Sequence, residues 1–189
     1  VVQPGGQNSI LLASGANMRL RPEDLDQAEG LFEAAAAVLL QFESPLDVVD
    51  RALDLARKHG CRAVLDAGPA VDAPPQMLAK AHVLSPNETE TEALLHMEIR
   101  DMDSAFEAAH RFHDMGVETV LLKLGSRGAV LVSEEEEEWF PAFEIEPGEH
   151  VIRVRATENG VALDALRAWR SGEGVCDVRL TPLPEAAHA

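Results

Sequence analysis

The chain has 189 residues, 46% hydrophobic and 26% charged, a length and composition that suit one soluble domain with a sizeable core. Sixteen basic against 33 acidic residues give a net charge of −17, which argues against nucleic acid or an anionic membrane as a partner. No apolar run approaches the roughly 20 residues of a membrane span, no signal-peptide pattern is seen, and Cys61 and Cys176 lack metal-ligand spacing, so a cytoplasmic location is expected.

Strands alternate with helices along most of the chain. Short apolar runs predict strands, while apolar residues at helical spacing, with Pro near the start or Gly at the end, predict helices. The predicted strands are residues 9–14, 36–42, 61–68, 82–85, 117–125, 128–133 and 138–145, and the predicted helices are residues 20–32, 44–60, 87–97 and 103–116. This order is typical of βαβ units, so we expect an α/β fold with a mostly parallel sheet and helices on both faces.

The segment 128–143 has a different pattern. Two strand-like stretches joined by a polar turn predict an antiparallel hairpin at the edge of the sheet. The run Glu134–Glu138 is interpreted as a solvated turn, because a row of like charges is usually exposed. His110 and His113 stand at helical spacing behind Glu107 but have no further ligand set, so no metal site is predicted there.

Polar residues follow three of the predicted strands. Glu43 ends one strand, residues 87–90 follow a second, and residues 123–128 follow a third. Because ligands bind at the carboxyl ends of the strands in open α/β sheets, we expect these three segments to converge on one site.

Each of these segments has two interpretations. Asn87 with Glu90 three residues later fits a capping box, yet a helix start at a strand end also attracts phosphate, and a nearby carboxylate can hold Mg²⁺ through water. Gly125 and Gly128 suit a tight turn between strands, or a close backbone approach to a ligand. Glu43 can accept hydrogen bonds from a sugar hydroxyl or from the first amides of the following helix.

Taken together, these segments resemble the ribokinase (PfkB) family of ATP-dependent carbohydrate kinases. The resemblance runs from about residue 6 to residue 144, and several motifs agree in order and spacing. The matching stretches are "GQNSILLASGANMRL", "LLQFESPLDVV", "LDAGPA", "LSPNETETEALL", "VLLKLGSRGAVLV" and "FPAF".

The resemblance implies a ribokinase-like sheet flanked by helices, with ATP, Mg²⁺ and a small sugar as ligands. By matching positions it assigns Glu90 to the Mg²⁺–water network and Glu43 to the sugar. It assigns nucleotide or phosphate contacts to Asn87, Lys123, Gly125, Ser126 and Gly128. Lys123 stands where the family usually has Thr, and the segment that forms most of the family's β-lid has no match in this chain.

The family pattern continues into V-D-T-x-G-A-G-D, whose last Asp is the catalytic base, and here the chain departs from it. One alignment places Val161 at the base and Arg155 at an acid that helps to bind a monovalent cation, with a helix over residues 162–174. The alternative is that the tail is unrelated sequence. We therefore expect a ribokinase-like domain over residues 1–147 and a divergent segment over residues 148–189.

The sequence thus predicts a sugar kinase that transfers phosphate from ATP to a hydroxymethyl group, with little or no activity in this chain because no catalytic Asp is found. The alternative is a non-catalytic relative that binds nucleotide or serves only as a structural module. Because a matching N-terminal sugar-binding segment is absent, one side of the sheet is expected to expose apolar surface and to favour self-association.

Overall fold

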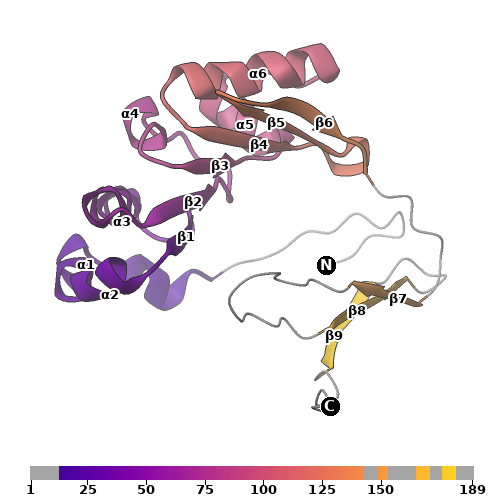
Figure 1. The fold of residues 1–189 in the computed structure, drawn as a ribbon. Helices are drawn as coiled ribbons and strands as arrows, with labels where there is room; N and C mark the ends of the chain where they lie inside the picture. The colour runs from indigo at the N-terminus through magenta and orange to yellow at the C-terminus, as the bar shows by residue number, and fades with distance from the viewer. Residues whose placement is uncertain (1–12, 143–148, 153–164, 171–175, 182–189) are drawn as a thin grey trace, which may run out of the picture. The chain divides into compact units, whose positions relative to one another are not determined.

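The computed structural model describes residues 13–142, 149–152, 165–170 and 176–181 (Figure 1). The chain divides into two compact units, one formed by Ala13–Phe143 and the other by Val1–Leu12 with Glu144–Ala189. Each unit has its own sheet, and the first unit holds all the helices of the described residues.

The first unit is built on a six-stranded sheet in the order β1-β2-β3-β4-β5-β6. The first four strands are parallel, and the last three form an antiparallel meander through β4, β5 and β6. The strands are β1 (Ala37–Gln41), β2 (Arg62–Asp66), β3 (Val83–Ser85), β4 (Thr119–Lys123), β5 (Ala129–Ser133) and β6 (Glu137–Phe140). The predicted mostly parallel sheet with an antiparallel edge hairpin is confirmed.

In the first unit the predicted helices are found at the expected places, but the structure has more helices than were predicted. They are α1 (Pro22–Gln27), α2 (Glu29–Ala34), α3 (Leu46–His59), α4 (Pro75–Leu78), α5 (Glu88–Leu95) and α6 (Met102–Asp114), with short 3₁₀ helices at Gly15–Arg19 and Gly125–Arg127. The single helix predicted over residues 20–32 is split, because the amide of Ala28 bonds back to Leu25 and closes α1 with a tight turn. The four-residue α4 lies in the segment predicted as a Pro-rich loop, and Pro75 occupies its first turn.

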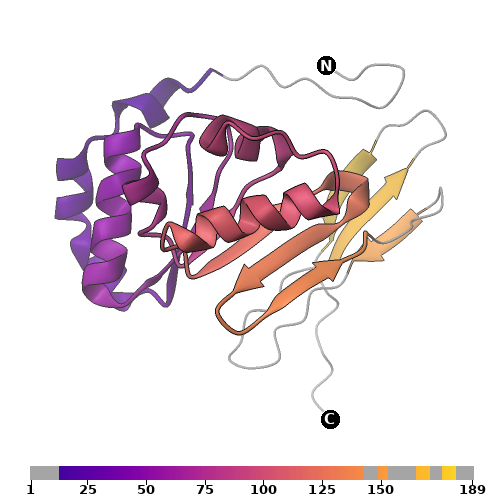
Figure 2. The ribbon, with the colours of Figure 1, turned by 90° about the horizontal axis from the view of Figure 1, so that it is seen from above.

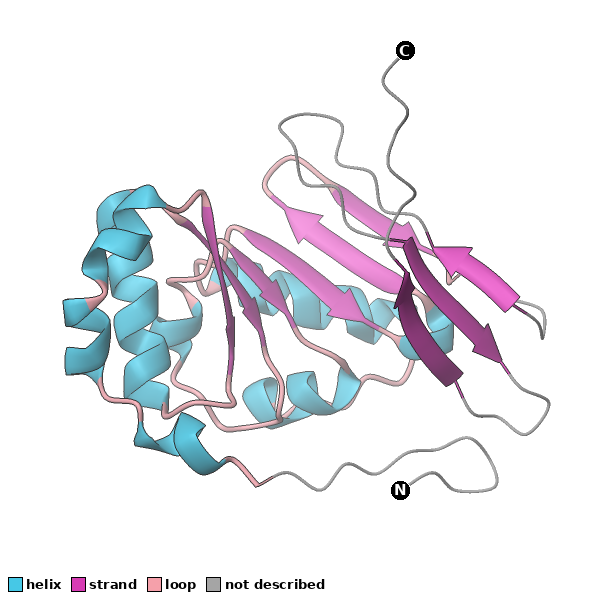
Figure 3. Ribbon diagram, turned by 90° about the horizontal axis from the view of Figure 1, so that it is seen from below, coloured by secondary structure: helices cyan, strands magenta, loops and turns pink. Residues whose placement is uncertain are grey.

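The described helices pack against one face of the sheet, so the prediction of helices on both faces is wrong for the described residues (Figures 1 and 3). Burial of the strand side chains follows the two faces of the sheet. On the helix side Leu65, Leu84 and Val120 are fully buried, whereas Leu39 on the opposite face is 79% exposed. The reason is the winding order. The chain visits β1 to β4 in sequence without reversing, and right-handed crossovers made in one direction bring every connecting helix to the same side.

Two amphipathic helices supply most of the helix side of the core. The helix α3 buries Val49, Leu53 and Leu55, and it ends at Gly60, whose φ of 67° is left-handed. The helix α6 lies across β4 and β5 (Figure 2) and buries three alanines together with Phe112. The alanines permit a close approach of α6 to the sheet, and Phe112 fills the remaining space.

The run of glutamates is only partly the turn that was predicted. Glu134 to Glu136 form the turn between β5 and β6, but Glu137 and Glu138 are the first residues of β6. Both strand residues are exposed, because β6 is the edge strand and these positions pair with β5 through the backbone alone.

The second unit contains an antiparallel sheet in the order β7-β8-β9, formed by β7 (Glu149–Ile152), β8 (Ala165–Arg170) and β9 (Cys176–Thr181). The helix predicted over residues 162–174 is therefore wrong at β8. Helix propensity is weak, and backbone pairing of β8 with a strand on each side overrides it.

One other prediction falls largely outside the described residues. Of the strand predicted over residues 9–14, only Ala13 and Ser14 are described, and neither lies in a strand.

Among the helices described, none combines the length and the hydropathy that crossing a membrane would require.

Substitutions at Phe112 and Leu39 test whether the core lies on only one face of the sheet. Phe112→Ala should lower the free energy of unfolding by about 3–5 kcal/mol, because it leaves a cavity beneath α6. Leu39→Ala should change it by no more than about 0.5 kcal/mol, because this side chain already faces solvent. Urea denaturation followed by circular dichroism measures both, and a Leu39→Ala loss comparable to that of Phe112→Ala would show that the second face is covered.

Candidate functional site

The four parallel strands end along one edge of the sheet, and this edge gathers most of the polar residues singled out from the sequence. The register aligns Gln41 at the end of β1 with Asp66 at the end of β2, and Asp66 with Ser85 at the end of β3. Beyond β3, Asn87 forms a parallel bridge with Lys123, the last residue of β4. Of the three segments that were predicted to converge, residues 87–90 and 123–128 are therefore in contact, while Glu43 lies farther along the same edge, beyond β1.

Asn87 and Glu90 form the predicted capping box at the start of α5. The side chain of Asn87 accepts a hydrogen bond from the amide of Glu90 at 2.9 Å. In return, the two carboxylate oxygens of Glu90 accept hydrogen bonds from the Asn87 amide at 2.7 Å and from the Asn87 side-chain nitrogen at 2.8 Å. Glu90 is only 7% exposed, so these bonds hold a buried carboxylate in one orientation at the carboxyl edge.

Lys123 links this cap to β2. Its Nζ lies 2.6 Å from Asp66 Oδ1 and 3.9 Å from Glu90 Oε2, so two carboxylates share one ammonium group. The backbone of Lys123 is held by a 2.8 Å hydrogen bond from its amide to the carbonyl of Pro86. The Lys123 side chain thus lies at the carboxyl edge, and the phosphate contact that the resemblance assigns to it stays a prediction.

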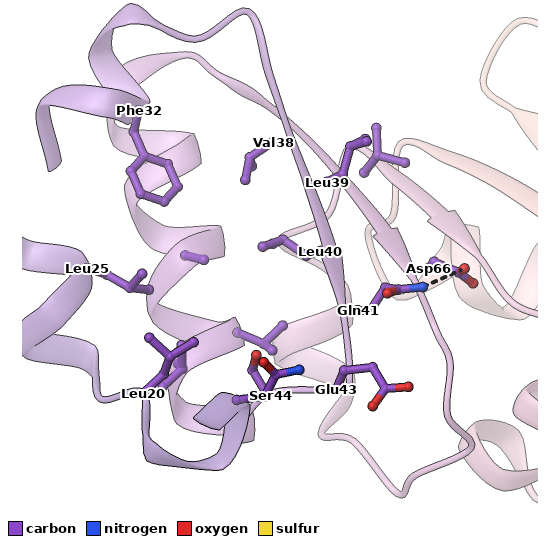
Figure 4. Close-up of a pocket in the computed structure, with 15 residues that line it drawn as sticks. Leu20, Leu25, Phe32, Val38, Leu39, Leu40, Gln41, Glu43, Ser44 and Asp66 are labelled. Atoms are coloured by element: carbon purple, nitrogen blue, oxygen red, sulfur yellow. Dashed lines mark hydrogen bonds between the residues drawn. The ribbon is translucent and has the colours of Figure 1, made fainter. Parts of the chain in front are cut away.

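Asp66 was not singled out from the sequence. It is the last residue of β2, and the rule that selected the other residues, a polar side chain at the carboxyl end of a parallel strand, applies to it equally. Its Oδ2 accepts a 3.3 Å hydrogen bond from the side chain of Gln41, which belongs to the neighbouring strand (Figure 4).

Glu43 lies just beyond β1 and lines a cavity of about 650 Å³ around that strand. In Figure 4, Gln41, Glu43 and Asp66 lie on one side of β1, while Leu25, Phe32, Val38 and Leu40 lie on the other. In the first turn of α3, which begins after Pro45, the amide of Val48 bonds to the side chain of Asp47 at 2.9 Å, and among the described residues no hydrogen bond joins Glu43 to that helix. The role of Glu43 as an acceptor for a bound hydroxyl stays a prediction.

Of the two glycines in the turn after β4, one is required by the packing of the fold. A Cβ on Gly128 would lie 1.9 Å from the carbonyl oxygen of Phe140, so the end of β6 requires glycine there. Gly125 is different: it has a φ of 55°, and a Cβ on it would have nothing within 4 Å. Gly125 and Ser126 are exposed, so this half of the turn is the part that is open to a ligand.

The turn is also tied to α5. The guanidinium of Arg127 pairs with Glu88 in the first turn of that helix and donates a 3.2 Å hydrogen bond to the carbonyl of Arg100. Trp139 of β6 donates a 2.8 Å hydrogen bond to the carbonyl of Arg127. The turn and the start of α5 therefore form one connected unit at the carboxyl edge.

A magnesium ion would find suitable oxygen donors in Asp66 and Glu90. Mg²⁺ prefers one or two carboxylates together with phosphate oxygens and water, and does not require a cage of protein ligands. Within the described residues there is no group of three or more metal-ligating side chains. His110 pairs with Glu137 at 3.3 Å, and His113 bonds the carbonyl of Val117 at 2.9 Å.

Val161 and Arg155, the residues aligned with the catalytic base and the monovalent-cation acid, lie outside the described residues. Their roles stay predictions from the sequence.

The family model and the similar proteins all point to the same family of kinases. The model of the pfkB family carbohydrate kinases matches residues 1–149. The chain is 40% identical over 127 residues to a ribokinase of Haemophilus influenzae and 32% identical over 165 residues to a deoxyribokinase of Salmonella typhi. These alignments cover 67% and 87% of this chain but 42% and 51% of the two enzymes, so the chain spans about half the length of these relatives.

The fold agrees with the sequence comparison. An Arabidopsis thaliana ribokinase, solved in complex with ribose and ATP, superposes with a TM-score of 0.63 at 32% identity. The superposition covers 75% of this chain and 46% of that one.

The two glycines of the turn provide a matched pair for experiment. Both have positive φ, so alanine should cost about 1 kcal/mol of unfolding free energy at either position. Gly128→Ala should cost about 1–3 kcal/mol more, because its methyl group overlaps the backbone of Phe140. Thermal and urea denaturation of both variants test this, and equal losses would contradict the packing of β6 against the turn.

Proposed function

The chain belongs to the pfkB family of carbohydrate kinases, and on that premise we propose that its carboxyl edge binds Mg·ATP beside a small sugar. The observation that carries the proposal is the grouping of Lys123, Asp66 and Glu90 next to the capped start of α5. Phosphoryl transfer depends mainly on positioning and on neutralising charge, and this edge offers an ammonium group, a helix start and carboxylates for a metal.

In this proposal the phosphates of ATP, the Mg²⁺ ion and the sugar bind at different parts of the carboxyl edge of the sheet. The phosphates would lie against Asn87, Lys123 and the open half of the turn, at Gly125 and Ser126. Asp66 and Glu90 would hold Mg²⁺, which when bound supplies charge neutralisation for the transferred phosphate.

The sugar would bind beside Glu43, in the cavity along β1. Glu43 follows β1 and Asn87 follows β3, so two strand spacings of about 4.8 Å separate them, roughly 10 Å in all. That separation leaves room for a pentose between the carboxylate of Glu43 and the phosphate side of the site. The names of the relatives, ribokinase and deoxyribokinase, make ribose and deoxyribose the first sugars to test.

We propose further that this chain transfers phosphate slowly. A valine at position 161 cannot accept the proton of the attacking hydroxyl, and loss of a general base costs about 10²–10⁴ in rate. The competing proposal is a non-catalytic relative that keeps nucleotide binding, and a structural module without ligands is the third.

Nucleotide binding separates the first two proposals from the third. Isothermal titration with ATP should give heat that requires Mg²⁺, and Glu90→Gln should weaken binding at least tenfold by removing a metal-binding charge, about 1.4 kcal/mol. Glu107→Gln is the control, because Glu107 pairs with Arg111 on an exposed face of α6. An absence of Mg²⁺-dependent heat in the folded wild type would exclude the nucleotide site.

Turnover separates the kinase from the non-catalytic relative. With ribose and Mg·ATP, ADP release by the wild type should fall far below about one per second, the lower end of ordinary enzymes. Val161→Asp should raise the rate by about 10²–10⁴ if this position faces the attacking hydroxyl.

Two results would contradict this account of turnover. Wild-type turnover of about one per second or faster would show that the chain has a base elsewhere. An unchanged rate in Val161→Asp, with nucleotide still bound, would favour the non-catalytic relative and an unrelated tail.

A further inference from the structure

Lys123 is one of three lysines in a chain with 33 acidic residues, and it is the one placed at the carboxyl edge. Its ammonium contacts Asp66 of β2 at 2.6 Å and Glu90 of α5 at 3.9 Å. These are the same two carboxylates that offer oxygens to a divalent cation. The site therefore already contains a positive charge, covalently attached to β4.

The two carboxylates are oriented by other groups and not by Lys123 alone. Glu90 receives two hydrogen bonds from Asn87, and Asp66 receives one from Gln41. A Cβ on Gly68 would lie 3.0 Å from Glu90 Oε1, so the glycine leaves space beside that oxygen. Removing the ammonium group would leave two preoriented anions at the edge, one of them buried, with no cation to balance them.

A dication and this ammonium cannot occupy the pair together without strong repulsion at such short distances. We propose that Lys123 is the resident counter-ion of the site, and that it excludes free divalent cations until a nucleotide offers phosphate oxygens as an alternative partner. The inference rests on the proposed function for the role of the nucleotide, but the competition between Lys123 and the metal is a property of this chain alone.

Lys123 is able to make this exchange. Its side chain is 39% exposed and has four rotatable bonds, so the ammonium can turn from the carboxylates to a phosphate without movement of β4. The metal would then enter together with the nucleotide, and binding of either should strengthen binding of the other.

Mn²⁺ tests the competition directly, because the electron paramagnetic resonance signal of free Mn²⁺ reports binding without nucleotide or sugar. Lys123→Met should bind Mn²⁺ at least about tenfold more tightly than the wild type, since the repelling charge is gone. Lys123→Arg keeps the charge and should remain within about twofold of the wild type. Adding Asp66→Asn to Lys123→Met should remove the gain, because it deletes one of the two anions.

Lys80 provides a matched control. Its ammonium also bridges two carboxylates of α3, at 2.8 Å to Asp50 and 2.7 Å to Asp54, but neither of them is buried, whereas the Glu90 side chain beside Lys123 is only 10% exposed. Lys80→Met should change Mn²⁺ binding by less than about twofold, because this pair lacks a buried carboxylate that is held in place as Glu90 is by Asn87.

Equal Mn²⁺ affinities for the wild type and Lys123→Met would overturn the inference, provided that circular dichroism shows both to be folded. If Lys123→Met is unfolded alone, restoration of its helical signal by Mn²⁺ but not by a monovalent salt supports the inference. Failure of Mn²⁺ to restore the fold would count against it. These outcomes are independent of Mg·ATP binding by the wild type, which tests the proposed function.

Discussion

Charge balance at the carboxyl edge of the sheet is the constraint on which the rest of the site depends. A chain with a net charge of −17 brings the carboxylates of Asp66 and Glu90 together where β2 and α5 meet β4. Two carboxylates this close to one ammonium group repel each other, and the positive charge between them offsets that repulsion. Lys123 supplies that cation in the ligand-free chain, and it thereby connects a strand end, a helix start and the glycine turn.

The winding of the chain explains why this edge is accessible. Four parallel strands laid down in one direction bring the described helices to a single face, and α3 and α6 bury that face almost completely. The opposite face carries partly buried and exposed side chains, and Leu39 is the most exposed large apolar residue among those described. Glu43 and Asp66 lie on the side of β1 away from Leu25, Phe32, Val38 and Leu40, and the cavity around β1 is lined from both sides of the strand (Figure 4).

The glycine turn shows how one motif can serve packing and binding at once. Gly128 is required by the backbone of Phe140, whereas Gly125 has open space around it. In the family resemblance both glycines approach the nucleotide, and spacing alone could not separate their roles. The difference arises because β6 folds back over one end of the turn, and that contact joins residues twelve positions apart, Gly128 and Phe140.

The sequence by itself determined the local features: the strand and helix order, the capping box of Asn87 and Glu90, the antiparallel hairpin and the family motifs. These depend on residues within a few positions of one another, where spacing and propensity are informative. Only the tertiary structure decided that Asp66 shares the ammonium of Lys123, that Gly128 packs under Phe140, that one face of the sheet carries no described helix, and that residues 165–170 form a strand. Each of these is a pairing between distant segments, and such pairings are decided by packing and by charge in three dimensions, which no local pattern records.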